Sequence, residues 1–215
     1  MPEHKTTFII TSVIHFSQKK VLGSSLRSVF SPEDRTVQTL NTIRSIRAKV
    51  PGAFIILLEM GKNRNIAEEL IGAVDKYVFI GQKTLVRWAV NGKFRGLGEA
   101  VGLITAKKDL NTGADFFFKI SGRYLLNEHF DTTQWQHDLF SARKYSEDIS
   151  TRLYGFNRKF FGEWQNALKR SLFQLYRGMS LEEVLPVKFG KQRIYNMQKI
   201  GVSGYTAPNG EYLEE

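Results

Sequence analysis

The sequence contains no cysteine and no long apolar run, and these two absences exclude several classes of protein. Without cysteine there can be no disulfide scaffold, thiolate zinc site, iron–sulfur cluster or cysteine nucleophile. No window approaches the ~20 apolar residues that a membrane-spanning helix needs, and the apolar run after the charged start is too short for a signal peptide. We therefore expect a cytoplasmic protein without a transmembrane segment, which leaves peripheral contact with a membrane open.

Histidine is also scarce. The four histidines, His4, His15, His129 and His137, are not spaced like the ligands of a metal site. The sequence therefore predicts no histidine-based metal centre.

Acidic residues are fewer than basic ones, with 21 Asp and Glu against 31 Lys and Arg and a formal charge of +10. Such an excess suits nucleic acid, an anionic membrane face or phosphorylated small molecules. Many cations lie in the last third, from Arg152 to Lys199, among Phe and Tyr. Several of their apolar neighbours recur at helical spacing and are expected to face the core, which argues against bases stacking on them. We therefore explain these cations first by a basic acceptor or diphosphate site, second by a solvated surface, and last by a nucleic-acid site.

The first half of the chain alternates buried strands with amphipathic helices. A β-branched strand is predicted over Thr6–Ile14, and a helix begins at Ser31, whose capping hydroxyl precedes Pro and two acids, and ends at Pro51–Gly52. A second apolar strand follows at Phe54–Leu58. Two strands that are apolar throughout and are joined by a helix indicate a parallel βαβ unit.

Later segments continue and then lose this rhythm. Helices are expected at 66–73, 96–108, 163–176 and 180–184, strands at 76–80, 115–120 and 151–156, and a Gly-rich tail at 201–210. At ~100–200 residues per domain, the 215 residues form one domain. The predicted fold class is α/β, a Rossmann-like, mainly parallel mixed sheet flanked by helices, with 1–125 as its nucleotide-binding half and 126–215 as a less regular portion.

The strand at 115–120 runs directly into polar residues. Lys119 and Ser121 alternate with an apolar residue and so project to one side, Gly122 permits close backbone approach, and Arg123 carries a planar donor suited to phosphate. Ligands of open α/β sheets bind at this end of the strands. The alternative is that Lys119 and Arg123 are solvated strand-end charges.

Four segments together resemble a known family: the strand Thr6–Ile14, the helix that contains Arg35–Arg47, the strand that ends at Glu59, and the hexapeptide KISGRY at 119–124. In this order they resemble the GT-A-fold nucleotide-sugar glycosyltransferases, and most of all the WavE-like proteins of lipopolysaccharide and capsule synthesis. TRLYGF at 151–156 and the glycine-rich segment 201–210 extend the resemblance over nearly the whole chain.

The resemblance implies a transferase that moves a sugar from a nucleotide-diphosphate sugar to a glycan or polysaccharide acceptor. The donor would lie at the carboxyl ends of the first strands, where Thr11, Ser12 and Val13 would line the nucleotide site. Glu59 would contact the base or the ribose of the nucleotide. Residues 126–215 would form the acceptor side. For Glu59 the alternative is a loop carboxylate paired with Lys62 or Arg64.

The sequence departs from the family at the metal motif. GT-A enzymes usually carry Asp-x-Asp after the strand that reads FFFKIS here, but the sequence has no Asp-x-Asp, and Lys119-x-Ser121 stands in its place. Fixed cations can stabilise a diphosphate leaving group in place of a metal. We therefore expect transfer without metal or other cofactor, with Lys119 and Arg123 as electrostatic stabilisers.

An inverting transferase would also need a base for the acceptor hydroxyl. The candidates are Glu182, Asp131 and His129, whereas Glu183 follows Ser180 at the spacing of a capping box and is assigned a structural role. Retention or inversion stays open. The alternatives of other classes are a noncatalytic module of the same fold that binds a sugar nucleotide or a protein, and a nucleic-acid-binding protein.

Overall fold

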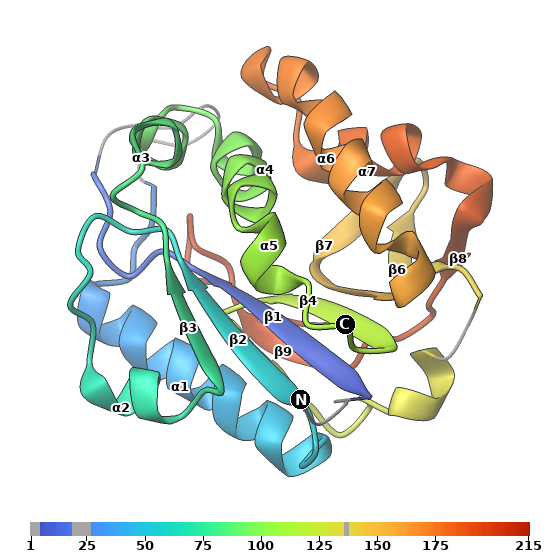
Figure 1. Cartoon of the computed structure of the whole chain (residues 1–215), viewed down its shortest axis with the longest axis horizontal. Coiled ribbons are helices and arrows are strands. Elements are labelled where there is room, and N and C mark those ends of the chain that lie inside the picture. Colours follow the sequence, from blue (N-terminus) through green and yellow to red (C-terminus); the bar gives the residue numbers. More distant parts are fainter. Residues whose placement is uncertain (1–4, 19–26, 136–137) are drawn as a thin grey trace.

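A seven-stranded mixed sheet crosses the molecule in the order β3-β2-β1-β4-β7-β6-β8 (Figure 1). The computed structural model describes residues 5–18, 27–135 and 138–215. The sheet consists of β1 (Thr6–Ser12), β2 (Phe54–Glu59), β3 (Lys76–Phe79), β4 (Phe116–Ser121), β6 (Phe140–Tyr145), β7 (Asp148–Asn157) and β8 (Ile194–Asn196). Strands β1 to β4 are parallel, β7 is antiparallel to both β4 and β6, and β8 is parallel to β6. This confirms the predicted α/β class with a mixed sheet.

Helices cover both faces of this sheet. They are α1 (Pro32–Lys49), α2 (Glu68–Gly72), α3 (Thr84–Asn91), α4 (Arg95–Thr105), α5 (Lys107–Leu110), α6 (Phe161–Tyr176) and α7 (Leu181–Phe189), with short 3-10 turns η1 (Thr132–Trp135), η2 (Arg158–Phe160) and η3 (Lys191–Arg193). Helix α1 begins where the sequence predicts, because Ser31 and Asp34 form a reciprocal capping box ahead of its first turn. None of the helices in the described part of the chain is both long and apolar enough to span a bilayer.

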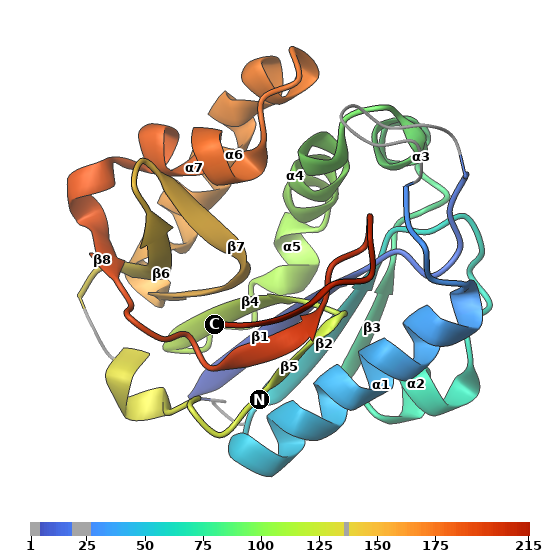
Figure 2. The same ribbon diagram turned by 180° about the vertical axis from the view of Figure 1, so that it is seen from behind.

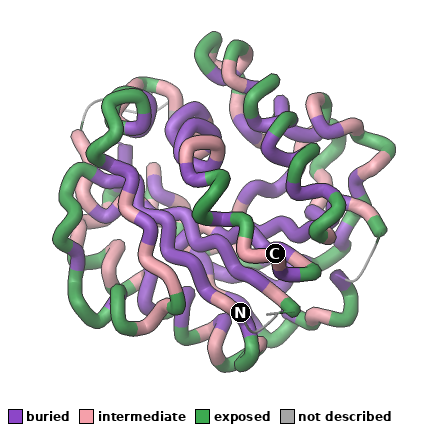
Figure 3. The backbone as a smooth tube through the Cα atoms, viewed as in Figure 1, coloured by how far each residue is buried: buried purple, intermediate pink, exposed green. Residues whose placement is uncertain are grey.

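The two faces of the sheet belong to two separate apolar clusters. Along β4, Phe117 packs into the cluster formed with α3, α4, α6 and α7, whereas Phe118 packs into the cluster formed with α1. Successive residues of a strand point to opposite faces, so a strand covered on both sides must be apolar throughout. The continuous apolar runs of β1, β2 and β4 thus lie at the buried centre of the molecule (Figure 3).

A smaller antiparallel sheet lies on the α1 side. It consists of β5 (Tyr124–Leu126), β9 (Val202–Tyr205) and β10 (Tyr212–Glu214), in the order β10-β9-β5 (Figure 2). The backbone amide of Leu126 donates to the Ser45 hydroxyl of α1, at 2.9 Å. This sheet fixes the segment that follows β9 beside the ends of β1 and β4.

Some elements differ from the sequence prediction. Helix α3 was not predicted; it is short and no side chain caps its first turn. The single helix expected over 96–108 is divided at Ala106 into α4 and α5, and α7 continues through Pro186 to Phe189. The glycine-rich tail contributes β9. Residues 19–26 lie outside the described residues, as do His4 and His137.

Candidate functional site

A cavity of about 520 Å³ opens where β1 and β4 end. Its floor is formed by Thr11–Val13 at the end of β1 and by Ser121–Arg123 at the end of β4. The two segments meet because β1 and β4 pair in parallel, with Thr11 opposite Ser121. The first turns of α1 and α7, the start of α4 and residues 206–208 form the walls. The volume lies in the range of small-molecule sites, and the place is where α/β sheets bind ligands.

Gly122 lets the two strand ends approach each other. Its amide donates to the carbonyl oxygen of Thr11 at 3.0 Å, and its own carbonyl accepts from the Thr39 hydroxyl of α1 at 3.1 Å. A β-carbon at this position would lie 3.0 Å from the Thr39 oxygen and 3.3 Å from Ile10. The close approach expected of Gly122 is thus found, and it is an approach to α1 and β1.

Lys119 lines the cavity, but its charge is already compensated. The side chain is 1% exposed, its ammonium forms an ion pair with the carboxylate of Glu99 on α4, and it donates to the carbonyl oxygen of Thr151 at 2.7 Å. It also lies over the ring of Tyr154, 5.5 Å from the centroid. The solvated strand-end charge considered as an alternative is therefore excluded for Lys119. The free cation expected here is not present either, because Glu99 holds it.

Arg123 is the second cation that the sequence places at this strand end. It is half-buried, lines the cavity and lies over the ring of Tyr124, 5.7 Å from the centroid. Within the described residues no carboxylate forms an ion pair with it. The fold adds Arg35 of α1, which donates to the carbonyl oxygen of Val13 at 2.6 Å. Among the described residues, six cations and two carboxylates line the cavity: Arg27, Arg35, Lys93, Lys119, Arg123 and Arg152, with Glu99 and Glu182.

Glu182 is the one proposed base that reaches the cavity. It lies in the first turn of α7, is half-buried, and accepts a hydrogen bond from the hydroxyl of Thr151. Its neighbour Glu183 closes the capping box instead, accepting from the Ser180 amide at 2.6 Å. Hydrogen bonds from Ser180 lower the pKa of Glu183. The structural role assigned to Glu183 is confirmed.

Asp131 and His129 are elsewhere. Neither belongs to the described residues that line the cavity. Asp131 is exposed and accepts from the Thr133 amide at 2.9 Å, and hydrogen bonds from Thr133 lower its pKa. It caps the η1 turn, so the geometry corrects its assignment as a base.

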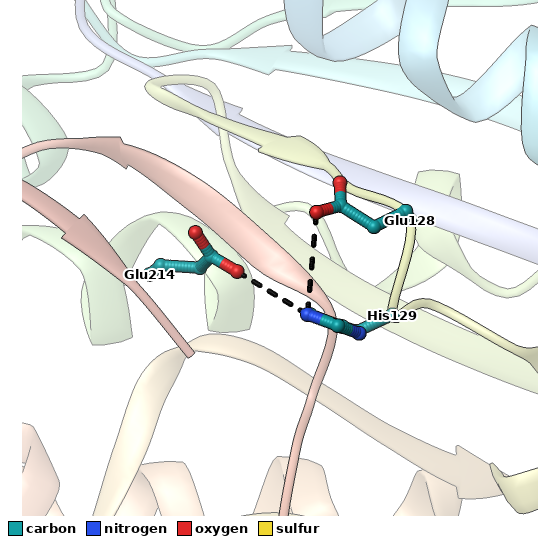
Figure 4. Close-up of side chains that lie close together, drawn as sticks. All are labelled: Glu128, His129 and Glu214. Atoms are coloured by element: carbon teal, nitrogen blue, oxygen red, sulfur yellow. Dashed lines mark ion pairs between the residues drawn. The ribbon is translucent and has the colours of Figure 1, made fainter.

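His129 faces two carboxylates at the edge of the small sheet. Its Nε2 lies 3.4 Å from Glu214 of β10 and 4.0 Å from the adjacent Glu128 (Figure 4). Their ligand atoms lie within 4.8 Å of one another, a spacing that a metal ion could use, although all three side chains are solvent-accessible. Spacing along the sequence gave no sign of this group, because Glu214 comes from a strand 85 residues further on.

Glu59 lies beneath the cavity, not on its surface. Its side chain is fully buried, and it accepts from the amides of Ile14 at 3.0 Å and Gly61 at 2.7 Å. Burial raises its pKa, although hydrogen bonds and the charge of Arg35 partly oppose this. Glu59 therefore contacts neither the cavity, where a base or ribose would lie, nor Lys62 or Arg64. Its contacts with backbone amides hold the loop after β1.

Sequence reasoning missed Glu99 and the role of Arg35 in the cavity. Arg35 was noted only as part of the helix, and one signal could have placed it: the first turn of the helix that follows β1 in a βαβ unit lies at the same sheet edge as the ligand site. Glu99 gave no local signal, because its partner Lys119 belongs to another element and the pairing depends on how α4 packs on β4.

Comparison with known proteins gives matches of structure only. No family model matches the sequence, and no curated protein does. Among solved structures, the galactosyltransferase LgtC, in complex with donor and acceptor sugar analogs, superposes with a TM-score of 0.57 at 8% identity, over 95% of this chain and 88% of that chain. The apo-form glycosyltransferase GlyE of Streptococcus pneumoniae TIGR4 gives a TM-score of 0.55 at 10% identity, over 89% and 45%. The bifunctional glycosyltransferase WbbM gives 0.53 at 10% identity, over 90% and 39%. The chain therefore has the fold of GT-A-type glycosyltransferases.

Proposed function

We propose that this protein is a glycosyltransferase that moves a sugar from a nucleotide-diphosphate sugar to a glycan or polysaccharide acceptor. The observation that carries the proposal is the cavity at the carboxyl ends of β1 and β4, where the described lining residues include six cations and two carboxylates. Its size suits a nucleotide sugar and its charge suits a diphosphate. The resemblance to WavE-like proteins suggests lipopolysaccharide or capsule as the acceptor's destination.

In the proposed reaction Arg123 binds the diphosphate. The bond between the sugar and the diphosphate breaks while the acceptor oxygen attacks, so negative charge develops on the leaving phosphate. A guanidinium at that position is stabilising because it opposes the developing charge. Lys119, paired with Glu99, contributes a smaller field and mainly holds β4 and α4 together. Glu182 accepts the proton of the acceptor hydroxyl, and the Thr151 hydroxyl orients it.

Metal independence is part of the proposal. A divalent metal would need oxygen ligands at the end of β4, where Ser121, Gly122 and Arg123 stand. Of the two described carboxylates of the cavity wall, Glu99 forms an ion pair with Lys119 and Glu182 accepts a hydrogen bond from Thr151. This donor set does not fit a metal held at that strand end, and we assign no step to one.

The test is donor binding and transfer with and without a chelator. Calorimetric titration with a panel of nucleotide sugars should give binding to at least one member, and EDTA should leave both affinity and transfer unchanged. Binding that vanishes on chelation would refute metal independence, and absence of binding to the whole panel would refute the function itself.

The second candidate is a noncatalytic module that binds a sugar nucleotide or a protein. What favours it is that Glu99, one of the two described carboxylates in the cavity wall, is already paired with Lys119, which leaves Glu182 as the single described carboxylate there that could act as a base. Tight donor binding without transfer or hydrolysis, for every acceptor offered, would favour this module over the transferase.

A further inference from the structure

Apolar side chains gather on the surface formed by α3 and the end of α6. Five residues there are between 45% and 65% exposed, and we call them the α3–α6 patch: Leu85, Trp88, Phe173, Tyr176 and Met179. Leu85 and Trp88 are three residues apart on α3, as Phe173 and Tyr176 are on α6, so each pair shares a helix face. The rings of Trp88 and Tyr176 lie 6.0 Å apart and join the two helices.

The patch continues to the mouth of the cavity. The ring of Phe94 lies 5.9 Å from that of Tyr176, and both Phe94 and Met179 line the cavity. Figure 1 shows α4 between α3 and α6, so these helices form one edge of the molecule. A contiguous exposed apolar area is uncommon on a monomeric protein and marks an interaction surface.

Uncompensated cations surround the patch. Lys83, Arg87, Lys93 and Arg177 are exposed, and within the described residues none of them forms an ion pair. Arg177 lies over the ring of Phe173, 5.5 Å from its centroid, and Lys93 over that of Phe94 at 4.9 Å. The sequence contains no Asp or Glu between Asp75 and Glu99, nor between Glu163 and Glu182. The surface is therefore apolar at its centre and positive at its rim.

We propose that the α3–α6 patch docks onto a phospholipid bilayer with anionic headgroups. Side chains such as Trp, Phe and Leu enter the boundary between headgroups and acyl chains, while Lys and Arg bind the anionic headgroups. Docking in this way directs the cavity mouth toward the membrane surface. The inference does not depend on glycosyl transfer, because it concerns binding alone.

Two other occupants fit the surface less well. A second copy docked face to face would bring together two rims of uncompensated positive charge, which repel each other. A free saccharide needs hydrogen-bonding partners, but Leu85 and Phe173 offer none from their side chains.

The tryptophans provide a specific probe. The chain has three, of which Trp135 and Trp164 are buried, at 1% and 0% exposure, and Trp88 is 52% exposed. A change of tryptophan emission on adding vesicles therefore reports on Trp88. The full chain would be mixed with vesicles of phosphatidylcholine, and with vesicles in which about one third is phosphatidylglycerol, and binding would be measured by emission and co-sedimentation.

We expect a blue shift and co-sedimentation with the phosphatidylglycerol vesicles alone, weakened by added salt. The variant Arg87→Gln/Arg177→Gln should bind about fivefold more weakly for each charge removed. The variant Leu85→Ser/Phe173→Ser should bind about 100-fold more weakly, since it loses two buried apolar groups. Val37→Ser, an exposed apolar site on α1, and Lys107→Gln on α5 are the matched controls and should bind as the parent does.

Four outcomes would overturn the proposal. The first is that the protein does not bind phosphatidylglycerol vesicles, and the second is that the α3–α6 variants bind them as well as the parent does. The third is that the emission of Trp88 shifts without vesicles and sedimentation shows self-association. The fourth is that a soluble oligosaccharide alone shifts the emission of Trp88.

Discussion

The ammonium of Lys119 and the carboxylate of Glu99 form an ion pair in the wall of the cavity, with the lysine almost completely buried and the glutamate 23% exposed. The pair joins β4 to α4 at the strand position where an acidic metal motif would stand in related folds. Its main consequence is for stability, because a buried charge that loses its partner is costly.

Lys119→Met should therefore destabilise the protein by about 3 kcal/mol, because it leaves Glu99 partly buried without its cation. The double variant Lys119→Met/Glu99→Gln should recover most of this loss, since neither charge remains. Urea unfolding measures both. Lys159→Met is the control: it breaks the exposed pair with Asp138 and should change stability far less, because an exposed ion pair contributes little. Equal losses at the two sites would contradict the buried role of Lys119.

Arg123→Ala should weaken the binding of a nucleoside diphosphate by about 10- to 100-fold, which corresponds to the loss of a charge-assisted hydrogen bond. Stability should change little, because Arg123 forms no ion pair within the described chain. Arg123→Lys should recover part of the affinity, since lysine keeps the charge but lacks the planar pair of donors. Calorimetric titration is the measurement, and unchanged affinity in Arg123→Ala would place the diphosphate elsewhere.

Two adjacent glutamates on α7 allow a matched comparison of catalysis. Glu182→Gln should lower the rate of transfer by about 100-fold or more while donor affinity stays the same, because the amide still accepts from Thr151 but takes up no proton. Glu183→Gln should leave transfer unchanged, because glutamine also closes a capping box. Steady-state kinetics of both variants check this. A transfer rate in Glu182→Gln equal to that of the parent would remove Glu182 as the base.

Glu59→Gln should alter the pH dependence of stability. Burial raises the pKa of Glu59 from its usual value of 4.5, so the folded state binds the proton more tightly than the unfolded state does. The free energy of unfolding of the parent should therefore fall as the pH rises above 4.5 and through the folded-state pKa. Glutamine does not titrate, and its oxygen can still accept from Ile14 and Gly61.

The variant should accordingly gain stability relative to the parent as the pH rises. Thermal unfolding of both proteins between about pH 4 and pH 8 measures the difference. A difference that stays constant across this range, or that changes with the opposite sign, would show that burial does not dominate the pKa of Glu59.

Local signals fixed most of the fold. The apolar runs at β1, β2 and β4 and the capping residues Ser31 and Ser180 predicted elements that the structure contains, because strand burial and helix caps depend on neighbouring residues in sequence. Helix α3 escaped prediction because it has no side-chain cap, and two of the apolar residues on it, Leu85 and Trp88, face solvent. Here tertiary packing, not the local pattern, determines the element.

The site was predicted in part. The sequence by itself determined where a ligand cavity would form, because parallel strands place their carboxyl ends together and polar residues follow β1 and β4 there. Only the tertiary structure decided the partner of each charged side chain. Glu99 forms an ion pair with Lys119, Glu59 is buried and accepts from backbone amides, and His129 lies beside Glu214 at the smaller sheet. These pairings join residues from separate elements, and contact between such residues depends on packing in three dimensions, which spacing along the chain does not encode.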